Sequence, residues 1–405
     1  MIIGINYAPE MISTSVYTTG LAEMLASAGH KVEVITALPY FPNWKVFSGY
    51  SKFRYFNENP SENLHVLHCP LYVPSNPTGL LRILHHASFA LSSFPRAISW
   101  AFRNRPDIVF VIAPSLVSAP VGWLSAKICG AKTWLHIQDF EVEAAFATGL
   151  IREESKLGWL AKKFELWVLK KFDRISSISE PMILKLIQKG VLSDAVFELR
   201  NWADLDHISP LTEKSPMRDI LGIETPYVVL YSGNLANKQG LEIIPDVARR
   251  LIDRKDLTFV ICGEGPFLTK LRHLSIGLSN VRIFSLQPLE KFNDTLGMAT
   301  VHILPQIAGA ADLVLPSKLT NMLASGRPII VTAEVDTALA KEVEGCGITV
   351  IPGDADALKN AIISLLDSEN DREKMGVSAR EAAVIRWDKK SIFKKLEEEL
   401  TKIAY

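Results

Sequence analysis

The stretch at residues 301–331, VHILPQIAGAADLVLPSKLTNMLASGRPIIV, indicates the fold of the chain. Its pattern predicts a buried strand, a loop of small residues, a helix opened by Pro316 and Ser317, and a second strand, at residues 301–304, 306–312, 316–324 and 328–331. A strand followed by a loop and a helix start directs backbone N–H groups and the positive end of the helix dipole to one place, which suits a phosphate group. Lys318 in the first helical turn is unfavourable for the helix and therefore suggests an anionic ligand. The alternative is an exposed lysine on an ordinary connection.

The composition is that of a soluble globular protein. The 405 residues predict two domains, and 48% of them are hydrophobic and 22% charged. Lys+Arg and Asp+Glu are both 44, so net charge gives no support for nucleic-acid binding. The scattered cysteines predict free thiols in a reducing compartment, with no disulfide or zinc site: Cys69, Cys129, Cys262 and Cys346. With no signal-like N-terminus and no apolar run of membrane-spanning length, we expect a cytoplasmic location.

Strands and helices alternate in two consecutive series. The first predicts strands at residues 2–6, 31–36, 64–69, 107–112, 132–137 and 174–179, and helices at 14–28, 80–103 with a break at Pro95, 116–129 and 155–172. The second predicts strands at residues 227–232, 257–262, 281–285, 301–304, 328–331 and 348–351, with helices at 241–253, 267–273, 289–298, 316–324 and 387–405. This order predicts an α/β fold with two doubly wound parallel sheets facing a cleft. Ligands of such sheets bind at the carboxyl ends of the strands.

Two polar segments follow strands of the first series. In YAPEMISTSV, residues 7–16, the hydroxyls of Ser13 and Thr14 suit a phosphate or a sugar, and capping of the following helix is an equal alternative. The strand at residues 132–137 ends in HIQD, where His136 and Asp139 are candidates to orient a substrate hydroxyl or to act as acid or base.

Three loops of the second series are candidates for one ligand site. Gly233 permits close backbone approach, and Lys238 lies at a helix entry. The other two loops are CGEGP at residues 262–266 and LQP at residues 286–288. The sequence here is neither GxxxxGK[ST] nor GxGxxG, which argues against a P-loop protein and a nicotinamide oxidoreductase.

Five segments of the chain resemble, in this order, motifs of the retaining GT-B glycosyltransferases of family 4. They are NYAPE, HIQD, YSGNLANKQGLE, GEGP and LPSKLTNMLASGRPII. The likeness covers essentially the whole chain and is strongest to the branch that builds bacterial surface polysaccharides such as colanic acid and O-antigens. It implies an acceptor-binding Rossmann-like domain at residues 1–205, a nucleotide-sugar-binding one at 206–385, and a helix crossing back at 386–405. It also implies a UDP- or GDP-sugar donor, a saccharide acceptor that is often linked to polyprenyl diphosphate, and retention of anomeric configuration without a metal or other cofactor.

The resemblance assigns roles to single residues. The donor diphosphate would be contacted by the loop of Gly233, Asn234 and Lys238, in which the family often has an arginine where this chain has Asn234. The nucleoside would lie beside the turn Gly263, Glu264 and Gly265, with its base near Gln287. Independently of the resemblance, the chemistry suggests that the leaving diphosphate is stabilised by Lys238 and Lys318 with backbone amides around Val314 and Leu315, and Ser317 beside them is a further donor-binding candidate. His136 matches the residue beside the transferred sugar, with Asp139 nearby. Ser13, Thr14 and Ser15 fall where many members carry a glycine-rich donor loop.

The chain departs from the family at two positions. Many members carry two glutamates eight positions apart, under the donor sugar and on the ribose, where this chain has Ala310 and Lys318. Because a lysine ammonium cannot accept a hydrogen bond, ribose recognition by a carboxylate is lost there. Our hypothesis is that Lys318 serves the diphosphate and supplies the charge missing at Asn234. Asp312 is the candidate to replace the first carboxylate as a catalytic residue.

Two basic, apolar segments suggest contact with an anionic membrane, on the inner face of the cytoplasmic membrane. The first combines Arg82, Arg96, Arg103 and Arg105 with Leu80, Leu81, Phe89, Phe94, Trp100 and Phe102; the second combines Lys162, Lys163, Lys170 and Lys171 with Trp159, Phe164 and Trp167. The alternative is two core-packing helices with solvated basic faces. Two other functions remain open at this point, namely a GT-B-type sugar-nucleotide epimerase and a non-catalytic GT-B subunit.

Overall fold

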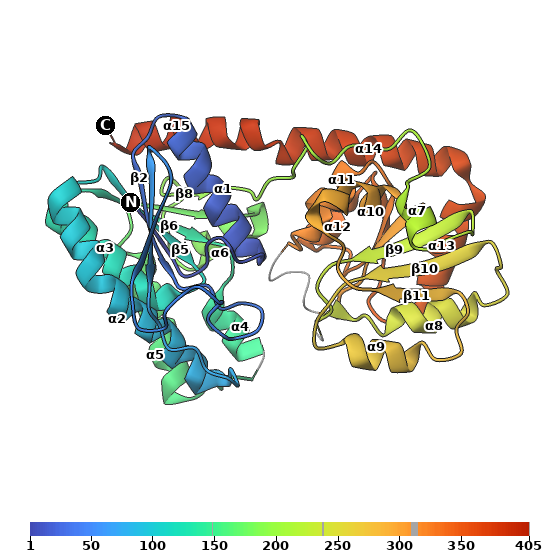
Figure 1. The fold of residues 1–405 in the computed structure, drawn as a ribbon, viewed down its shortest axis with the longest axis horizontal. Helices are drawn as coiled ribbons and strands as arrows, with labels where there is room; N and C mark the ends of the chain where they lie inside the picture. Colours follow the sequence, from blue (N-terminus) through green and yellow to red (C-terminus); the bar gives the residue numbers. More distant parts are fainter. Residues whose placement is uncertain (148, 237–238, 309–314, 405) are drawn as a thin grey trace. The chain divides into compact units, whose positions relative to one another are not determined.

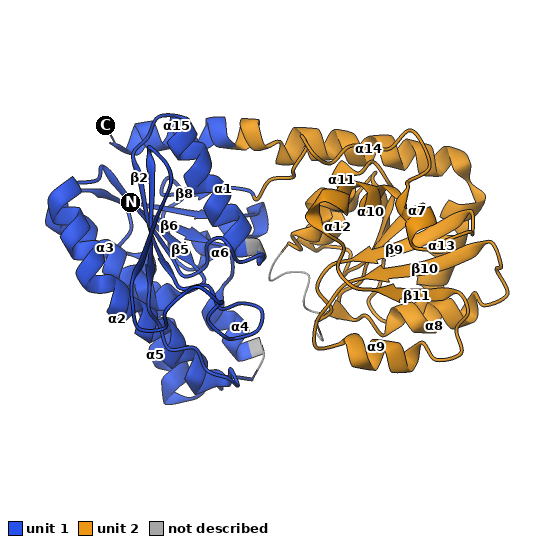
Figure 2. Ribbon diagram, viewed as in Figure 1, with its two compact units in different colours: residues 1–200, 393–405 blue, residues 201–392 orange. Residues whose placement is uncertain are grey.

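The computed structural model describes residues 1–147, 149–236, 239–308 and 315–404, without the side chains of Ser13 and Ala147. The chain divides into two compact units, unit 1 with residues 1–200 and 393–405 and unit 2 with residues 201–392 (Figure 2). Each unit contains one mainly parallel sheet between helices (Figure 1). The predicted α/β class with two doubly wound domains is confirmed.

The sheet of unit 1 has eight strands in the order β3-β4-β2-β1-β5-β6-β7-β8. They are β1 Ile2–Gly4, β2 Val32–Ala37, β3 Phe56–Ser61, β4 Leu64–Cys69, β5 Ile108–Ala113, β6 Lys132–Ile137, β7 Arg174–Ser177 and β8 Val196–Glu198. The central strands are apolar along most of their length because helices cover both faces of a parallel sheet. Neither edge strand, β3 or the three-residue β8, was predicted. In β3, FNENPS is largely exposed and lacks an alternating apolar pattern.

The helices of unit 1 differ from the sequence prediction at Pro95 and in two short helices, at residues 141–147 and 180–188, that were not predicted. The helices of this unit are α1 Ser13–Ser27, α2 Gly79–Asn104, α3 Ala119–Cys129, α4 Glu141–Ala147, α5 Lys156–Leu169, α6 Glu180–Gln188 and most of α15 Lys389–Ala404. The predicted break at Pro95 is wrong, because α2 runs through it as one helix. Pro95 is exposed, so water can hydrate the carbonyl left without its N–H partner. The buried stripe that includes Phe89 and Ala97 holds both halves of α2 against unit 1.

Unit 2 contains a six-stranded parallel sheet in the order β11-β10-β9-β12-β13-β14. Its strands are β9 Tyr227–Ser232, β10 Leu257–Cys262, β11 Val281–Phe284, β12 Val301–Leu304, β13 Ile329–Thr332 and β14 Gly347–Val350. The helices are α7 Met217–Ile220, α8 Ile243–Arg250, α9 Leu268–Leu274, α10 Phe292–Gly297, α11 Lys318–Ala324, α12 Ala338–Val343, α13 Ala355–Asp367 and α14 Glu369–Trp387. All six strands were predicted within two residues at either end, whereas α7, α12, α13 and α14 were not predicted.

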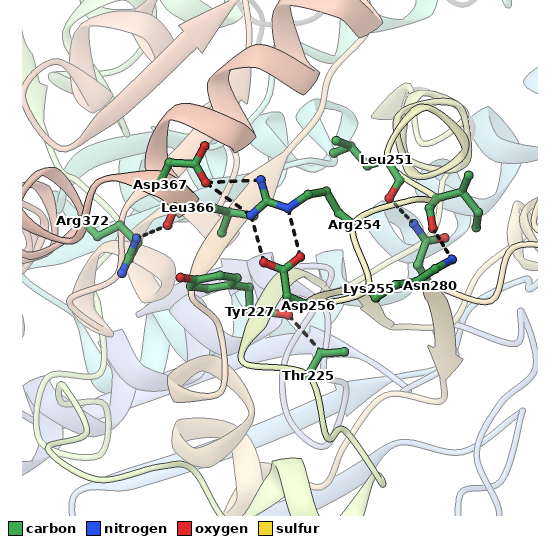
Figure 3. A network of polar contacts seen from close by, with 11 residues as sticks. Thr225, Tyr227, Leu251, Arg254, Lys255, Asp256, Asn280, Leu366, Asp367 and Arg372 are labelled. Atoms are coloured by element: carbon green, nitrogen blue, oxygen red, sulfur yellow. Dashed lines mark hydrogen bonds and ion pairs between the residues drawn. The ribbon is translucent and has the colours of Figure 1, made fainter.

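The amino ends of β9 and β10 are fastened by a polar network (Figure 3). Arg254 donates to both Asp256 oxygens at 2.9 and 3.0 Å and to Asp367 at the end of α13 at 3.2 Å. Asn280 donates to the Ala248 carbonyl oxygen at 2.8 Å, which ties the start of β11 to α8. This network lies at the sheet edge opposite the carboxyl ends of the strands, where it fixes the base of unit 2. Within the residues that the structure describes, no helix combines the length and apolar character needed to span a bilayer.

Candidate functional site

The strand order of unit 2 reverses between β9 and β12. These strands are neighbours, but the chain leaves β9 toward β10 and leaves β12 toward β13, so their following loops diverge at the carboxyl edge. The two loops nevertheless meet at one point, since a Cβ on Gly240 would lie 3.3 Å from the Gln306 carbonyl carbon. Doubly wound sheets bind their ligands at this kind of position.

Lys318 connects the two sides of this strand-order switch. Its ammonium nitrogen donates to the Tyr231 hydroxyl at 2.7 Å and to the Asn234 carbonyl oxygen at 3.3 Å, and it lies 4.9 Å from the centre of the Tyr231 ring. The Tyr231 hydroxyl lies 2.7 Å from two further acceptors, the Asn234 carbonyl oxygen and Gln239 Oε1. Burial raises the pKa of Tyr231, so the phenol stays protonated. The first turn of α11 is thereby joined to the loop that follows β9.

The absence of a side chain at Gly233 lets the Lys318 side chain pass over the loop after β9. The Gly233 φ of +138° is disfavoured for any residue with a side chain, and a Cβ there would lie 2.2 Å from Lys318 Cε. Gly263 approaches from the other side, and a Cβ on it would lie 2.1 Å from the Gly233 carbonyl oxygen. The sequence identified both glycines, and the structure brings them into direct contact.

The GEGP turn packs against the same loop. The Leu235 N–H donates to the Glu264 carbonyl oxygen at 2.8 Å, and a Cβ on Gly265 would lie 2.5 Å from the Leu235 carbonyl oxygen. The Glu264 side chain is exposed and available to a ligand. The structure therefore brings together five of the predicted donor-binding residues, Gly233, Asn234, Gly263, Glu264 and Gly265, with Lys318 beside them.

The other predicted donor-binding residues of unit 2 are less informative. Gln287 donates to the Ser285 carbonyl oxygen at 2.9 Å in the segment after β11. Leu315 is buried, and the Ser317 carbonyl oxygen accepts from the Thr320 hydroxyl at 3.0 Å. Three predicted residues lie outside the described residues: Lys238, Asp312 and Val314.

In unit 1, His136 lies inside the sheet rather than on a loop. It is 3% exposed, and burial lowers its pKa to about 3. Its Nδ1 lies 2.9 Å from the Ser176 hydroxyl, which also accepts from the Trp134 indole N–H at 2.7 Å. A neutral imidazole with so low a pKa is a poor base near neutrality. The geometry favours a hydrogen-bonding role for His136 over the alternative of acid–base catalysis.

Glu141, a half-buried carboxylate just after β6 in unit 1, was missed by the sequence analysis. Glu141 accepts from the Ser115 and Leu116 N–H groups at 2.5 and 2.6 Å, and it lines a cavity of about 10 Å³, the space of one water molecule, with Asp139 and Glu165. Burial raises the pKa of Glu141, and the two N–H groups oppose that rise. The sequence did contain a sign of this residue, because Glu141 is separated from the HIQD motif by only one residue.

Glu10 in the NYAPE loop is held in a similar way. Its Oε1 accepts from the Tyr40 and Phe41 N–H groups at 2.7 and 2.8 Å, and its Oε2 accepts from Asn6 at 2.8 Å. Glu10 therefore ties the loop after β1 to the loop after β2.

The serine-rich segment at the start of α1 contributes to the same loop. The N-cap residue of α1 is Ile12, so the predicted capping by Ser13 or Thr14 is wrong at the observed helix start. Ser15 is buried and donates to the Glu10 carbonyl oxygen at 2.6 Å, while the Thr14 carbonyl oxygen accepts from Thr18. Their contact with a donor stays a prediction.

The described residues contain no group of three or more His, Cys, Asp or Glu side chains arranged to hold a metal ion. All four cysteines are free, and three of them are buried: Cys69, Cys262 and Cys346. Burial raises the pKa of the Cys69 and Cys262 thiols to about 12, so they act as apolar core residues.

Two doubly wound units, with closely packed glycine loops at the carboxyl edge of the second, define the architecture of a GT-B glycosyltransferase. Residues 14–202 match the glycosyl transferase 4-like domain, and residues 213–382 match the glycosyl transferases group 1 family. The chain belongs to this glycosyltransferase family. The predicted resemblance is confirmed, and family membership favours a transferase over the epimerase and the non-catalytic subunit.

Among known proteins, the chain is similar to the putative colanic acid biosynthesis glycosyl transferase WcaI of Escherichia coli K12. The two are 38% identical over 97% of each chain. Among solved structures it is similar to sucrose-phosphate synthase of Thermosynechococcus elongatus, with a TM-score of 0.74, 16% identity, and coverage of 99% of this chain and 98% of that one. It is also similar to Anabaena HepE in complex with UDP-glucose, with a TM-score of 0.71, 14% identity and 99% of both chains covered. These structural likenesses show the fold.

Proposed function

We propose that this glycosyltransferase takes a sugar from a UDP- or GDP-linked donor and passes it to a lipid-linked saccharide in the synthesis of a surface polysaccharide. The donor is bound by unit 2 and the acceptor by unit 1. The observation that carries the proposal is the crossing of Lys318 over Gly233 at the strand-order switch of unit 2. The name of WcaI supports the polysaccharide, and the complex of HepE with UDP-glucose supports the class of donor.

The reaction breaks the bond between the anomeric carbon and the diphosphate, so negative charge develops on the leaving group. Lys318 lies where it can neutralise that charge, together with backbone N–H groups of the neighbouring loops. A lysine is a compact point charge that suits a phosphate oxygen. We propose that these groups make a metal ion unnecessary and that no other cofactor is used.

We propose further that the product retains the anomeric configuration of the donor. His136, neutral near pH 7, orients a hydroxyl of the transferred sugar, and Asp139 and Asp312 supply the carboxylates at the reacting carbon. Replacing His136 with Gln keeps a hydrogen-bonding group, whereas Ala removes it. We expect the Gln variant to keep more activity than the Ala variant. We also expect the activity of the Gln variant to depend on pH as that of the wild type does.

The test is a transfer assay on the whole protein. UDP- and GDP-sugars are first screened by thermal shift, because a ligand that binds only the folded state raises its apparent stability. The donor that binds is then incubated with lipid-linked oligosaccharides, and the anomeric configuration of the new linkage is read by NMR. Transfer with retention in the presence of EDTA supports the proposal. A chain that neither transfers nor hydrolyses any nucleotide sugar would contradict it, and abolition by EDTA would contradict metal independence.

A lipid-linked acceptor favours contact with the membrane, and we propose that unit 1 provides it. The side chains of Leu80, Leu91 and Phe102 on α2 are 68–76% exposed among exposed arginines. On α5, Lys163 Nζ lies 3.9 Å from the centre of the half-exposed Trp159 ring. Basic and aromatic side chains in this arrangement suit an anionic interface. One predicted contributor is wrong, since Phe89 is fully buried in the core.

Flotation with vesicles tests this contact. Binding to phosphatidylglycerol vesicles and weak binding to phosphatidylcholine vesicles is the expected result, with loss of binding when Leu80, Leu91 and Phe102 are replaced by Ser. Equal recovery with both kinds of vesicle, or no binding to either, would instead indicate solvated faces of ordinary core-packing helices.

A further inference from the structure

We propose that a pocket in unit 1 binds an anionic sugar or sugar phosphate of the acceptor. The pocket has a volume of about 750 Å³ and is lined by Asn43, Trp44, Lys45, Val46, Lys52, Phe53, Pro70, Leu71, Tyr72, Val73, Ser75 and Ser88. Apart from Ser88 of α2, these residues come from the two segments that follow β2 and β4. This inference rests on the proposed function, because it treats the ligand as the acceptor of the transfer.

The position of the pocket fits a substrate site. β2 and β4 are adjacent parallel strands, so the segments that follow them emerge at the same carboxyl edge of the sheet. Glu10 from the loop after β1 fastens the start of the first segment at the Tyr40 and Phe41 N–H groups. The pocket therefore lies at the ligand-binding edge of a doubly wound sheet.

The walls of the pocket are held in place from behind. The Lys45 N–H donates to the Tyr40 carbonyl oxygen at 3.2 Å. The buried His85 ring packs 4.5 Å from the Tyr40 ring and 5.2 Å from the Trp44 ring, between centres. Both backbone groups of Tyr72 bond to α2, with Ser88 accepting at 2.8 Å and His85 Nδ1 lying 2.6 Å from the carbonyl oxygen. A pocket fixed in this way loses little freedom when a ligand binds.

The aromatic lining suits a sugar ring. Phe53 is 89% exposed and Tyr72 is 43% exposed, although both are large side chains. Exposed apolar groups that line a concavity mark a binding site more often than an ordinary surface. Aromatic faces can cover the C–H groups of a sugar, while the Tyr72 hydroxyl and Asn43 offer polar contacts.

The charge of the lining selects an anion. Lys45 and Lys52 are exposed, and neither has an ion pair with any residue in the described part of the chain. Among the described lining residues there is no aspartate or glutamate, and the Arg82 guanidinium adds a third positive charge 5.9 Å from the Trp44 ring. A uronic acid carboxylate and the phosphate next to a lipid carrier share the chemistry that this lining recognises.

The binding test uses the whole protein and small probes. Methyl glucuronide and glucose 1-phosphate are titrated by NMR, with methyl glucoside as the neutral control. We expect both anionic probes to bind more tightly than the neutral one. We expect the double variant Lys45→Gln, Lys52→Gln to weaken them about tenfold, and Phe53→Ala to weaken all three probes. Lys132→Gln and Leu192→Ala are matched controls, because both residues are exposed and neither lines the pocket.

The outcomes separate this inference from the proposed function. The inference is overturned if neither anionic probe binds the wild type at about 10 mM, or if the double variant leaves their affinities within about twofold. Methyl glucuronide as the tighter ligand would assign the pocket to an acidic sugar, and glucose 1-phosphate would assign it to the phosphate end of the acceptor. If the protein binds the probes but transfers no sugar, the proposed function is contradicted and the binding pocket is supported. If the protein transfers sugar and the double variant has an unchanged acceptor KM, the pocket inference is contradicted and the proposed function is not.

Discussion

The Lys318 ammonium nitrogen lies 2.7 Å from the hydroxyl of Tyr231, a residue 87 positions earlier in the chain. This hydrogen bond joins the helix after β12 to the end of β9, so it spans the point where the strand order of unit 2 reverses. Because Tyr231 is buried and Lys318 is only partly exposed, the lysine is held in place before any ligand arrives. A charge held in this way costs little further ordering when it meets a diphosphate.

Replacing Gly233 with alanine should displace Lys318. The new Cβ would lie 2.2 Å from Lys318 Cε in a backbone conformation with φ of +138°. We expect a loss of about 1–3 kcal/mol in the free energy of unfolding, together with weaker donor binding. The measurements are urea denaturation and calorimetric titration with the donor.

Gly277→Ala is the matched control for Gly233→Ala. Gly277 also has a positive φ, of +80°, but nothing lies within 4 Å of the Cβ it would gain. Its stability loss should be about 1 kcal/mol, with unchanged donor affinity. Equal donor affinity in both variants would contradict the contact of Gly233 with Lys318 as a determinant of binding.

Replacing Glu10 with alanine should loosen the loop after β2. The Tyr40 and Phe41 N–H groups would lose their common acceptor, and we expect a loss of about 2–4 kcal/mol in stability. Glu10→Gln should recover most of it, because its amide oxygen can accept from the same two groups while Asn6 rotates its own amide. Thermal unfolding of both variants measures these losses. Equal losses of stability in Glu10→Ala and Glu10→Gln would contradict the role of Glu10 as a hydrogen-bond acceptor.

Acid should destabilise the protein through its buried histidines. Burial lowers the pKa of His85 to about 4 and those of His136 and His302 to about 3, from 6.5. Between pH 6.5 and these values the unfolded chain binds more protons than the folded one, so stability falls as pH falls. Each histidine contributes up to about 1.4 kcal/mol per pH unit in that window.

Urea denaturation at pH 7, 6 and 5 measures this effect. His302→Gln should flatten the slope of stability against pH, while His273→Gln, at an exposed position, should keep the slope of the wild type. The buried-histidine account would fail if the two variants had the same slope.

The network at the amino edge of unit 2 should affect stability alone (Figure 3). Arg254→Gln removes the ion pairs to Asp256 and Asp367. The side chains are 30% exposed for Arg254, 38% for Asp256 and 59% for Asp367. Because water screens such pairs, we expect a loss of about 0.5–1 kcal/mol, with no change in the donor dissociation constant. A change in donor affinity would show that the two edges of the sheet are coupled.

Much of the fold followed from the sequence because buried parallel strands are continuous apolar runs, as in YVVLYS at β9 and LTFVIC at β10. The edge strand β3 and the helix α14 escaped prediction because FNENPS is polar and α14 has little contrast between its faces. Pro95 misled because a helix can continue through a proline at an exposed position, where water hydrates the freed carbonyl.

The donor side of the site was predictable in part, because GNLANKQG, GEGP and LPSK are local strand-end signals. The contact of Lys318 with Tyr231 was not, since a tyrosine inside an apolar strand gives no sign of where its hydroxyl ends. The pocket of unit 1 was also missed. Its residues come from two segments brought together only by the pairing of β2 with β4.

The central claim is that Lys318 binds the donor diphosphate in place of a glutamate on the ribose. The most direct measurement is the donor dissociation constant of Lys318→Gln by calorimetry, beside the wild type and Lys341→Gln, an exposed lysine on α12. Loss of a charge-assisted contact predicts weakening of about tenfold or more for Lys318→Gln alone. A dissociation constant within about twofold of the wild type would contradict the claim.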